Sequence, residues 1–254
     1  MEAMLKLEGV TQKFGGLVAV ADLNIDVYQG EIVGLIGPNG AGKSTTFNVI
    51  TGVYLPAEGK VFFEGNEITG KPIYEITRRG IARTFQNIRL FQSLSVLNNV
   101  QIGMHGQIKS SLWQAMLNLP GKKKKEQEVI ERAMSLLAMT QLASHADDRA
   151  DSLAYGSQRR LEIVRAMASG AKLLLLDEPA AGMNEQETNE LLTFILSLKG
   201  RGYTILLIEH DMRLVMSLCD RIYVQNQGRL IASGTPDEIR NNTDVIDAYL
   251  GREV

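Results

Sequence analysis

Apolar residues along this chain fall into short runs near both ends and into a helical rhythm between them. Near the N-terminus, four runs predict β-strands at Leu5–Val10, Leu23–Tyr28, Glu31–Ile36 and Lys60–Phe63. Gln29-Gly30 and Glu64-Gly65 predict hairpin turns between some of these strands, because glycine tolerates the backbone angles of tight turns. The first third is therefore expected to be mostly β structure.

The middle of the chain, from about position 95 to 148, changes to helical spacing. Its clearest stripe consists of Val129, Ala133, Leu136 and Leu137, which predicts a helix with this stripe in the core. Pro120-Gly121 and the four lysines Lys122–Lys125 interrupt the pattern, and we expect them to form an exposed, solvated loop.

The last third alternates between apolar strands and amphipathic helices. The expected elements are Leu173–Asp177, Glu185–Lys199, Thr204–Ile208 and Met212–Leu218. Such alternation implies a mostly parallel sheet that is covered on both faces.

The end of the chain predicts a hairpin and then a helix. Arg221–Gln225 and Arg229–Ser233, joined at Asn226-Gln227-Gly228, read as the closing hairpin. Thr235-Pro236-Asp237-Glu238 has the form of a capping box with proline at the first helical position. The predicted fold is an α/β core with a mostly parallel sheet, an antiparallel β region and a helical insertion.

Length and composition restrict the classes of protein. The chain has 254 residues and 44% hydrophobic content, which predicts one domain over 1–254. Within it we expect 1–93 and 151–254 to form the core and 94–150 to form a helical subdomain. The formal charge of −2 argues against nucleic acid as the main partner. The single cysteine, Cys219, rules out an internal disulfide and fits a reducing compartment. No apolar run approaches the roughly 18 residues of a membrane span, and the N-terminus lacks a signal-peptide core, so any membrane role is expected to come through a partner.

The most informative motif is Gly37–Thr45, which reads Gly-Pro-Asn-Gly-Ala-Gly-Lys-Ser-Thr between a predicted strand and a predicted helix. This pattern is that of the phosphate-binding loop, whose backbone N–H groups and lysine surround the phosphates of a nucleoside triphosphate. The expected nucleotide ligands are Asn39, Gly40, Ala41, Gly42, Lys43, Ser44 and Thr45. The hydroxyl of Ser44 is also expected to bind Mg²⁺.

A second motif is the apolar strand Leu173–Asp177, which ends in two consecutive carboxylates. Asp177 is placed to hold Mg²⁺ in the manner of a Walker B aspartate. Glu178 is placed to accept a proton from an attacking water. The sequence therefore predicts hydrolysis of the triphosphate.

With Leu153–Arg160 opening a helix before that strand, the whole chain resembles the nucleotide-binding subunit of an ATP-binding cassette (ABC) transporter. The resemblance implies a P-loop NTPase fold, with ATP and Mg²⁺ bound. It also implies that Phe14 stacks on adenine, that Gln86 contacts the metal and joins Lys43 and Glu178 in catalysis, and that His210 is the switch histidine. Leu153–Ser157 is the expected signature, with Gly156 and Ser157 facing nucleotide, and Ala181–Asn184 is the expected D-loop.

Within that family the motifs are similar to those of the branched-chain amino acid uptake ATPases. The stretches that carry this likeness are Lys13–Leu17, Arg83–Gln86, Leu153–Gly156, Asp177–Gly182, Ile208–Met212, Gly234–Asn242 and a helical insertion around Met104–Lys125. The chain departs from the usual family pattern at Ala154 and Tyr155 in the signature and at Asn184 in the D-loop.

The resemblance implies a head-to-tail pair of cassettes, with each ATP between the phosphate loop of one subunit and the signature of the other. The implied partners are two membrane permease subunits, a second, non-identical ATPase subunit and, indirectly, a solute-binding protein, at the cytoplasmic face of the inner membrane. Ile88–Phe91 is the expected docking surface for a permease, with Leu90 and Phe91 exposed.

Other functions stay open. The same machinery serves other solutes, such as urea, amides or aromatic acids. A soluble ABC-type ATPase of DNA repair or translation is disfavoured because the chain has neither two cassettes nor a long coiled-coil insertion. A GTPase is disfavoured because no Asn-Lys-x-Asp motif occurs.

Overall fold

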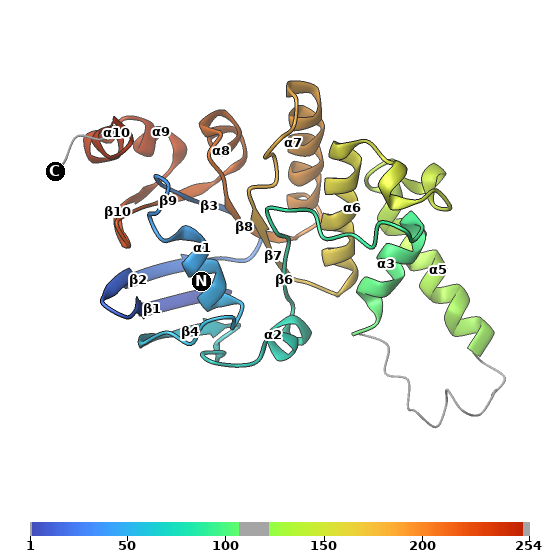
Figure 1. Cartoon of the computed structure of the whole chain (residues 1–254), viewed down its shortest axis with the longest axis horizontal. Coiled ribbons are helices and arrows are strands. Elements are labelled where there is room, and N and C mark those ends of the chain that lie inside the picture. Colours follow the sequence, from blue (N-terminus) through green and yellow to red (C-terminus); the bar gives the residue numbers. More distant parts are fainter. Residues whose placement is uncertain (1, 107–121, 251–254) are drawn as a thin grey trace.

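The structure is a computed structural model that describes residues 2–106 and 122–250. Two β-sheets with helix α1 between them form one side of the molecule, and a group of helices forms the other (Figure 1).

A six-stranded sheet forms the centre, with strand order β10-β9-β3-β8-β7-β6. Its strands are β3 (Ile32–Ile36), β6 (Ile81–Arg83), β7 (Leu173–Asp177), β8 (Thr204–Ile208), β9 (Arg221–Asn226) and β10 (Arg229–Gly234). Five strands run parallel, and only β10 pairs antiparallel, with β9. Every residue of β3, β7 and β8 is buried, as expected for parallel strands covered on both faces.

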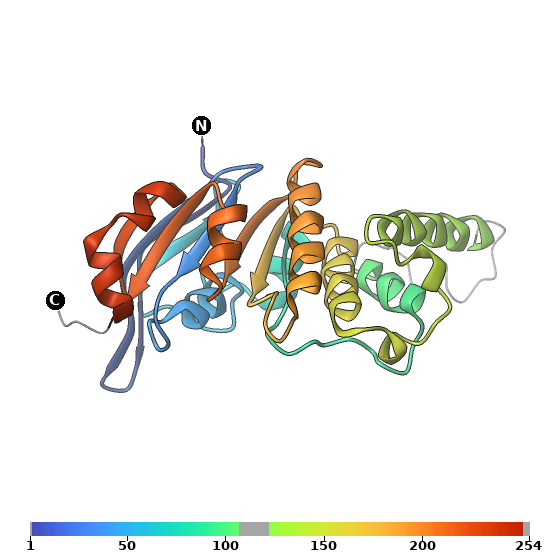
Figure 2. The ribbon, with the colours of Figure 1, turned by 90° about the horizontal axis from the view of Figure 1, so that it is seen from above.

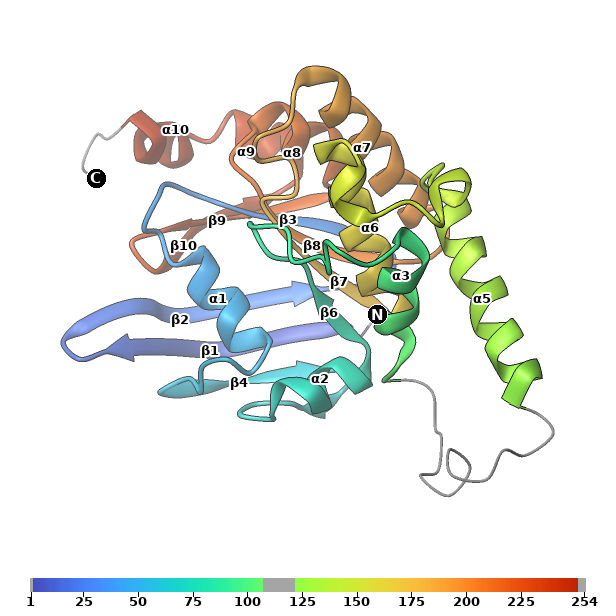
Figure 3. The same ribbon diagram turned by 45° about the vertical axis from the view of Figure 1, so that its right-hand side comes forward.

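The two faces of this sheet have different covers. Leu174 and Leu176 of β7 belong to the core that packs under helices, whereas Leu173 and Leu175 point into the other core. Helices α6 (Tyr155–Ala168), α7 (Glu185–Lys199), α8 (Met212–Leu218) and α9 (Pro236–Arg240) lie on the first face. Helix α1 (Lys43–Ile50) and the second sheet cover the other face (Figure 3).

The second sheet is antiparallel, with strand order β2-β1-β4-β5. Its strands are β1 (Leu5–Phe14), β2 (Leu17–Val27), β4 (Glu58–Phe63) and β5 (Asn66–Glu67), and α2 (Ile73–Arg79) follows. The Glu64-Gly65 hairpin is confirmed. The prediction of a hairpin at Gln29-Gly30 is wrong, because the strands on either side of this turn, β2 and β3, enter different sheets. The actual hairpin turns at Gly15-Gly16 and joins β1 to β2, which are longer than the predicted strands.

The helices beside the sheet are α3 (Val96–Met104), α5 (Lys122–Ala138) and the short helices η1 (Ala143–His145) and η2 (Ala150–Ser152). Figure 2 shows α3 and α5 beyond α6, away from the sheet. The predicted stripe is confirmed, with Ala133 and Leu137 fully buried. The loop assigned to Lys122–Lys125 is wrong, because these residues form the first turn of α5. Pro120-Gly121 and most of the expected insertion at Met104–Lys125 lie outside the described residues.

The predictions for the end of the chain are confirmed. Strands β9 and β10 form a hairpin, and Thr235 and Glu238 cap α9 reciprocally with Pro236 in the first turn. Helix α10 (Thr243–Leu250) follows. Among the described residues, none of the helices has the length and apolar character needed to cross a membrane.

Candidate active site

The phosphate loop leaves the end of β3 and enters α1 at Lys43. Gly42 precedes the helix with φ 101°, and a Cβ there would lie 2.3 Å from the carbonyl oxygen of Ala19. A Cβ on Gly37 would lie 1.9 Å from the carbonyl oxygen of Gln225. Strands β2 and β9 thus press on the loop so closely that only glycine fits. The N-terminus of α1 is left facing outward, where backbone N–H groups can bind an anion.

Lys43 folds back over this loop. Its Nζ donates to the carbonyl oxygens of Gly37 (2.7 Å) and Pro38 (2.9 Å), and the residue is only 6% exposed. Burial lowers the pKa of Lys43, while the negative charges of Glu178 and Asp177 oppose this shift. The charge of Lys43 therefore interacts with the two carboxylates that follow one another at the end of β7.

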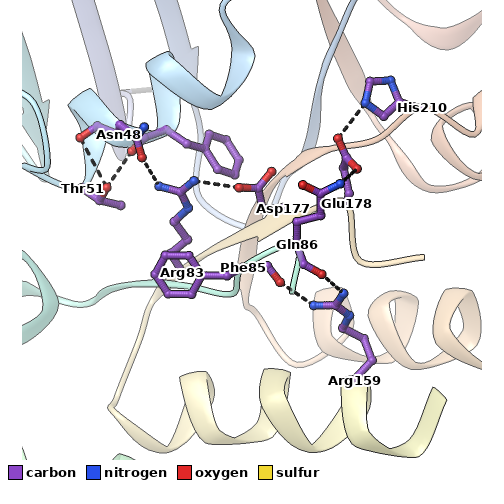
Figure 4. Close-up of polar contacts among 10 residues, drawn as sticks. Asn48, Thr51, Arg83, Phe85, Gln86, Arg159, Asp177, Glu178 and His210 are labelled. Carbon is purple, nitrogen blue, oxygen red and sulfur yellow. Dashed lines mark hydrogen bonds and ion pairs between the residues drawn. The ribbon is translucent and has the colours of Figure 1, made fainter. Parts of the chain in front are cut away.

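Asp177, at the end of β7, is paired with an arginine. Arg83 donates to Oδ2 of Asp177 at 2.7 Å and to Oδ1 of Asn48 on α1 at 2.7 Å (Figure 4). The guanidinium also lies 5.4 Å from the ring of Phe47 and 5.2 Å from that of Phe85. The two charged side chains are each 9% exposed, so this is a largely buried ion pair that joins β6, β7 and α1.

Glu178, the next residue, is held on both carboxylate oxygens. Gln86 donates to Oε2 at 2.8 Å, and Nε2 of His210 lies 2.7 Å from Oε1 (Figure 4). The Glu178 backbone adopts φ 46°, in the left-handed region, and its N–H donates to the carbonyl of Ile208 on the neighbouring strand. Three residues predicted to act in catalysis thus meet at one carboxylate.

The segment that carries Gln86 is fastened to α6 by two buried charges. Arg159 donates to the carbonyl oxygens of Phe85 (2.6 Å) and Gln86 (2.5 Å), and to Oε2 of Glu162 (2.8 Å). Oε1 of Glu162 accepts from the backbone N–H of Arg89 at 3.1 Å. The side chains of Arg159 and Glu162 are 0% and 1% exposed.

A further buried carboxylate supports the loops after β7 and β8. Glu209 accepts from the backbone N–H groups of Ala180 (2.7 Å) and His210 (3.1 Å). Burial raises the pKa of Glu209, while these backbone hydrogen bonds oppose that shift. The carboxylate therefore ties the loop that bears His210 to the loop that follows Glu178.

Phe14 lies at the tip of the β1–β2 hairpin, and is 41% exposed. Its ring meets the ring of Tyr54 edge-on, with centroids 5.1 Å apart and an interplanar angle of 75°. An edge-on contact uses the rim of one ring, so a face of Phe14 is available to a flat ligand.

The signature lies at the N-terminus of α6, with Ala154 exposed at the N-cap. The N–H of Gly156 donates to Oε1 of Glu187 at 3.0 Å, and the hydroxyl of Tyr155 donates to the carbonyl of Ala181 at 3.1 Å. No hydrogen bond joins Gly156 or Ser157 to the phosphate loop within the described part of the chain. The N–H of Gly156, a residue expected to face nucleotide, is thus bonded to Glu187 in this structure.

An open groove of about 480 Å³ lies between α2, β6, α3 and α6, beside the Gln86 segment. Phe91 lines it and is 48% exposed, which agrees with the predicted surface. Leu90 does not agree with that prediction, because it is half-buried against the core.

Several residues of the site escaped the sequence reasoning. Arg83 belongs to the recognised stretch Arg83–Gln86, but the sequence reasoning assigned it no role. Glu209 likewise belongs to the recognised stretch Ile208–Met212 and was assigned none. Arg159 and Glu162 occupy core-facing positions of a helix, and a charged pair at such positions is a signal that the sequence contains.

Comparisons with known proteins agree with this geometry. Residues 20–181 match the family described as ABC transporter, and residues 229–254 match the branched-chain amino acid ATP-binding cassette transporter family. The chain is 48% identical over 251 residues to the high-affinity branched-chain amino acid transport ATP-binding protein LivG of Escherichia coli K12, with 98% of each chain covered. BraF of Pseudomonas aeruginosa, with the same description, is 45% identical, again with 98% of each chain covered. A crystal structure of the ADP conformation of MJ1267, an ATP-binding cassette of an ABC transporter, has a TM-score of 0.87 at 33% identity and covers 99% of this chain and 100% of that one.

The chain therefore belongs to the ABC transporter family, as an ATPase with the P-loop fold that its motifs predicted. Within that family it belongs with the branched-chain amino acid transport ATP-binding proteins, and the resemblance drawn from its motifs is confirmed.

Proposed function

We propose that this chain hydrolyses ATP to drive the inward transport of branched-chain amino acids. The observation that supports the proposal best is the arrangement around Glu178. A carboxylate at the end of β7 is held by Gln86 and His210 and lies near the ammonium group of Lys43. The whole-length identity to LivG and BraF supports the substrate class.

The donor set fits a magnesium ion shared with phosphates. Among the hydrogen bonds of the described residues, the carboxylate of Asp177 accepts only from Arg83, and it does so through Oδ2. Its Oδ1 is therefore available to a ligand. Ser44 is exposed at the start of α1, and Gln86 supplies an amide oxygen. The described residues contain no group of three or more His, Cys, Asp or Glu side chains that could hold a metal ion by themselves. This agrees with a hard cation that takes most of its ligands from phosphate and water. Bound there, Mg²⁺ would neutralise charge on the phosphates.

The hydrolytic step follows from these positions. A water oxygen attacks the γ-phosphorus, while Glu178 accepts the proton that the water loses. The bond between the γ-phosphorus and the bridging oxygen breaks, and ADP leaves with the electron pair. Lys43 and the N–H groups from Asn39 to Thr45 hold the charged oxygens, and the face of Phe14 stacks on adenine.

The proposed assembly places two such cassettes head to tail. Gly156 and Ser157 of this chain would face the nucleotide of a second, non-identical ATPase subunit. Two permease subunits would hold the pair at the cytoplasmic face of the inner membrane, with a solute-binding protein on the other side. The groove lined by Phe91 is the proposed permease contact, since Phe85 and Arg89, which flank Gln86 along the chain, also line it.

A related transporter for urea, amides or aromatic acids would have the same cassette, so solute must be tested directly. Membranes with the tagged chain should yield permease subunits on purification, and cells should take up labelled leucine in a manner that Glu178→Gln abolishes. Copurification with ribosomes or DNA in place of permeases would reject a transport role. Normal leucine uptake in the variant would reject this substrate class.

A further inference from the structure

The buried ion pair Arg159–Glu162 has an unusual set of partners. Beyond each other, both side chains bond only to backbone atoms of the segment Phe85–Arg89, among the hydrogen bonds of the described residues. Removing two charges from water costs free energy, and an apolar pair of similar volume would fill this position at least as favourably. The contacts to the loop are therefore the part that an apolar pair could not supply.

The segment Phe85–Arg89 depends on these contacts for its position. It follows β6 without forming a helix or strand, so its backbone lacks the ladder of bonds that would hold it. The guanidinium binds two successive carbonyls, and the carboxylate binds an N–H three residues further on. The segment is thus attached at both ends to one turn of α6.

The pair is connected through Gln86 to the carboxylate of Glu178, and through helix α6 to the signature. Gln86, whose carbonyl Arg159 holds, donates from its side chain to Glu178 (Figure 4). Gly156, at the start of α6, lies three residues before Arg159 on the same helix. A rotation of α6 would therefore pull on the backbone that carries the Gln86 side chain.

We propose that Arg159 and Glu162 are positioning residues that make the Gln86 segment move with α6 as one body. This inference rests on the proposed function, in which Gln86 acts at the hydrolytic site and the signature meets a partner's nucleotide. Through the pair, contact at the signature places the Gln86 amide at Glu178 or withdraws it.

Three variants test the pair in the full-length chain. Arg159→Met roughly keeps the volume and removes the two bonds from Arg159 to the carbonyls of Phe85 and Gln86. In Glu162→Gln, one of the two carboxylate oxygens becomes an NH₂ group, which donates and cannot accept. The new side chain can therefore accept from Arg159 or from the N–H of Arg89, but it cannot keep both contacts in their present geometry. Glu190→Gln is the matched control, since the exposed carboxylate of Glu190 on α7 pairs with Arg160, the neighbour of Arg159 on α6.

Amide hydrogen exchange is the first measurement. Exchange of the amides from residue 86 to 90 should become about tenfold faster in Arg159→Met and in Glu162→Gln, and stay unchanged in Glu190→Gln, as expected for a locally opened segment. Unchanged exchange in both pair variants would overturn the inference. If Arg159→Met does not fold, Glu162→Gln decides alone.

Turnover of the assembled transporter is the second measurement. The pair variants should lower kcat and leave KM for ATP unchanged, and Arg159→Met should add no further loss in a Gln86→Ala background. A loss of equal size in that background would show a purely structural role. If Gln86→Ala and Glu178→Gln themselves hydrolyse ATP at the parent rate, the proposed catalytic site is wrong, whereas the exchange result still decides whether the pair holds the segment.

Discussion

At the residue scale, the two partners of the Glu178 carboxylate fix the orientation of the proposed general base. Both of its oxygens have partners, Gln86 and His210, so the orientation of the base is set before substrate binds. The left-handed backbone at Glu178 adds to this, because it aims the side chain in a way that an extended residue would not. Orientation, rather than charge alone, distinguishes Glu178 from the neighbouring Asp177.

Glu178→Gln should therefore remove the base and keep the site. We expect ATP binding at the parent affinity and turnover of the assembled transporter reduced by at least ~10²-fold, the low end for a general base. Lys43→Ala should instead weaken ATP binding itself, which titration of the isolated chain would measure. Parent-rate hydrolysis by Glu178→Gln would contradict the assignment of the base.

Arg83 makes a second residue-scale prediction. Arg83→Met should lower the free energy of unfolding by about 3 kcal/mol, because it leaves the carboxylate of Asp177 largely buried without its counter-ion. Urea denaturation would measure the loss, and adding Asp177→Asn should recover part of it.

The control for Arg83 is Lys172→Met. It breaks the exposed Lys172–Glu64 pair, whose side chains are 55% and 40% exposed, and should cost less than about 1 kcal/mol. Equal losses in the two variants would show that the Arg83–Asp177 pair contributes no more than a surface contact.

At the element scale, the side chain of Glu187 links the starts of α6 and α7. Glu187 accepts from the N–H of Gly156 on α6 and from the N–H of its own N-cap residue, Asn184. Asn184 in turn accepts from the N–H of Glu187, which completes a capping box. The asparagine that replaces the usual D-loop aspartate therefore still works as a helix cap.

Glu187→Ala should destabilise the protein by about 1–2 kcal/mol, since it removes a charge-assisted bond and half of a capping box. Thermal or urea unfolding would show the loss. Glu185→Ala is the matched control, because Glu185 lies in the same first turn of α7 and makes no side-chain hydrogen bond among the described residues. Its loss of stability should stay within about 0.5 kcal/mol. A similar loss in both variants would mean that only the general charge at this helix end matters.

At the scale of the whole molecule, the proposed assembly places the signature of this chain against the nucleotide of a second cassette. Ala154 is exposed at the N-cap of α6. In the proposed assembly, a serine at this position would present a hydroxyl to a partner's γ-phosphate. A hydrogen bond to a charged group contributes about 1.5–3 kcal/mol. Two copies of this chain would lack that bond at both sites, whereas a pair with a non-identical subunit would lack it at one.

The isolated chain should therefore remain largely monomeric with ATP, even as Glu178→Gln, and Ala154→Ser should promote self-association by at least about tenfold in the association constant. Sedimentation of Glu178→Gln with ATP, with and without Ala154→Ser, measures this. A tight ATP-dependent homodimer of the Ala154 form, unchanged by serine, would contradict an asymmetric working pair.

The sequence by itself determined the features that depend on neighbouring residues. The phosphate loop, the strand ending in Asp177-Glu178, the closing hairpin and the capped helix α9 are all local patterns, and the structure has each of them. At Gln29-Gly30 the turn forms, but the predicted hairpin does not, because β2 and β3 enter different sheets. A turn signal says that the chain bends, but it does not say which sheet receives the next strand.

Only the tertiary structure decided how distant side chains combine. Arg83 meets Asp177 from 94 positions away, and His210 meets Glu178 from 32, because the sheet places the ends of β6, β7 and β8 side by side. Arg159 reaches Gln86 across 73 positions because α6 packs over that same edge. Spacing along the chain contains no record of such neighbours. Burial and charge pairing, which settle their roles, exist only once the strands have their order in the sheet.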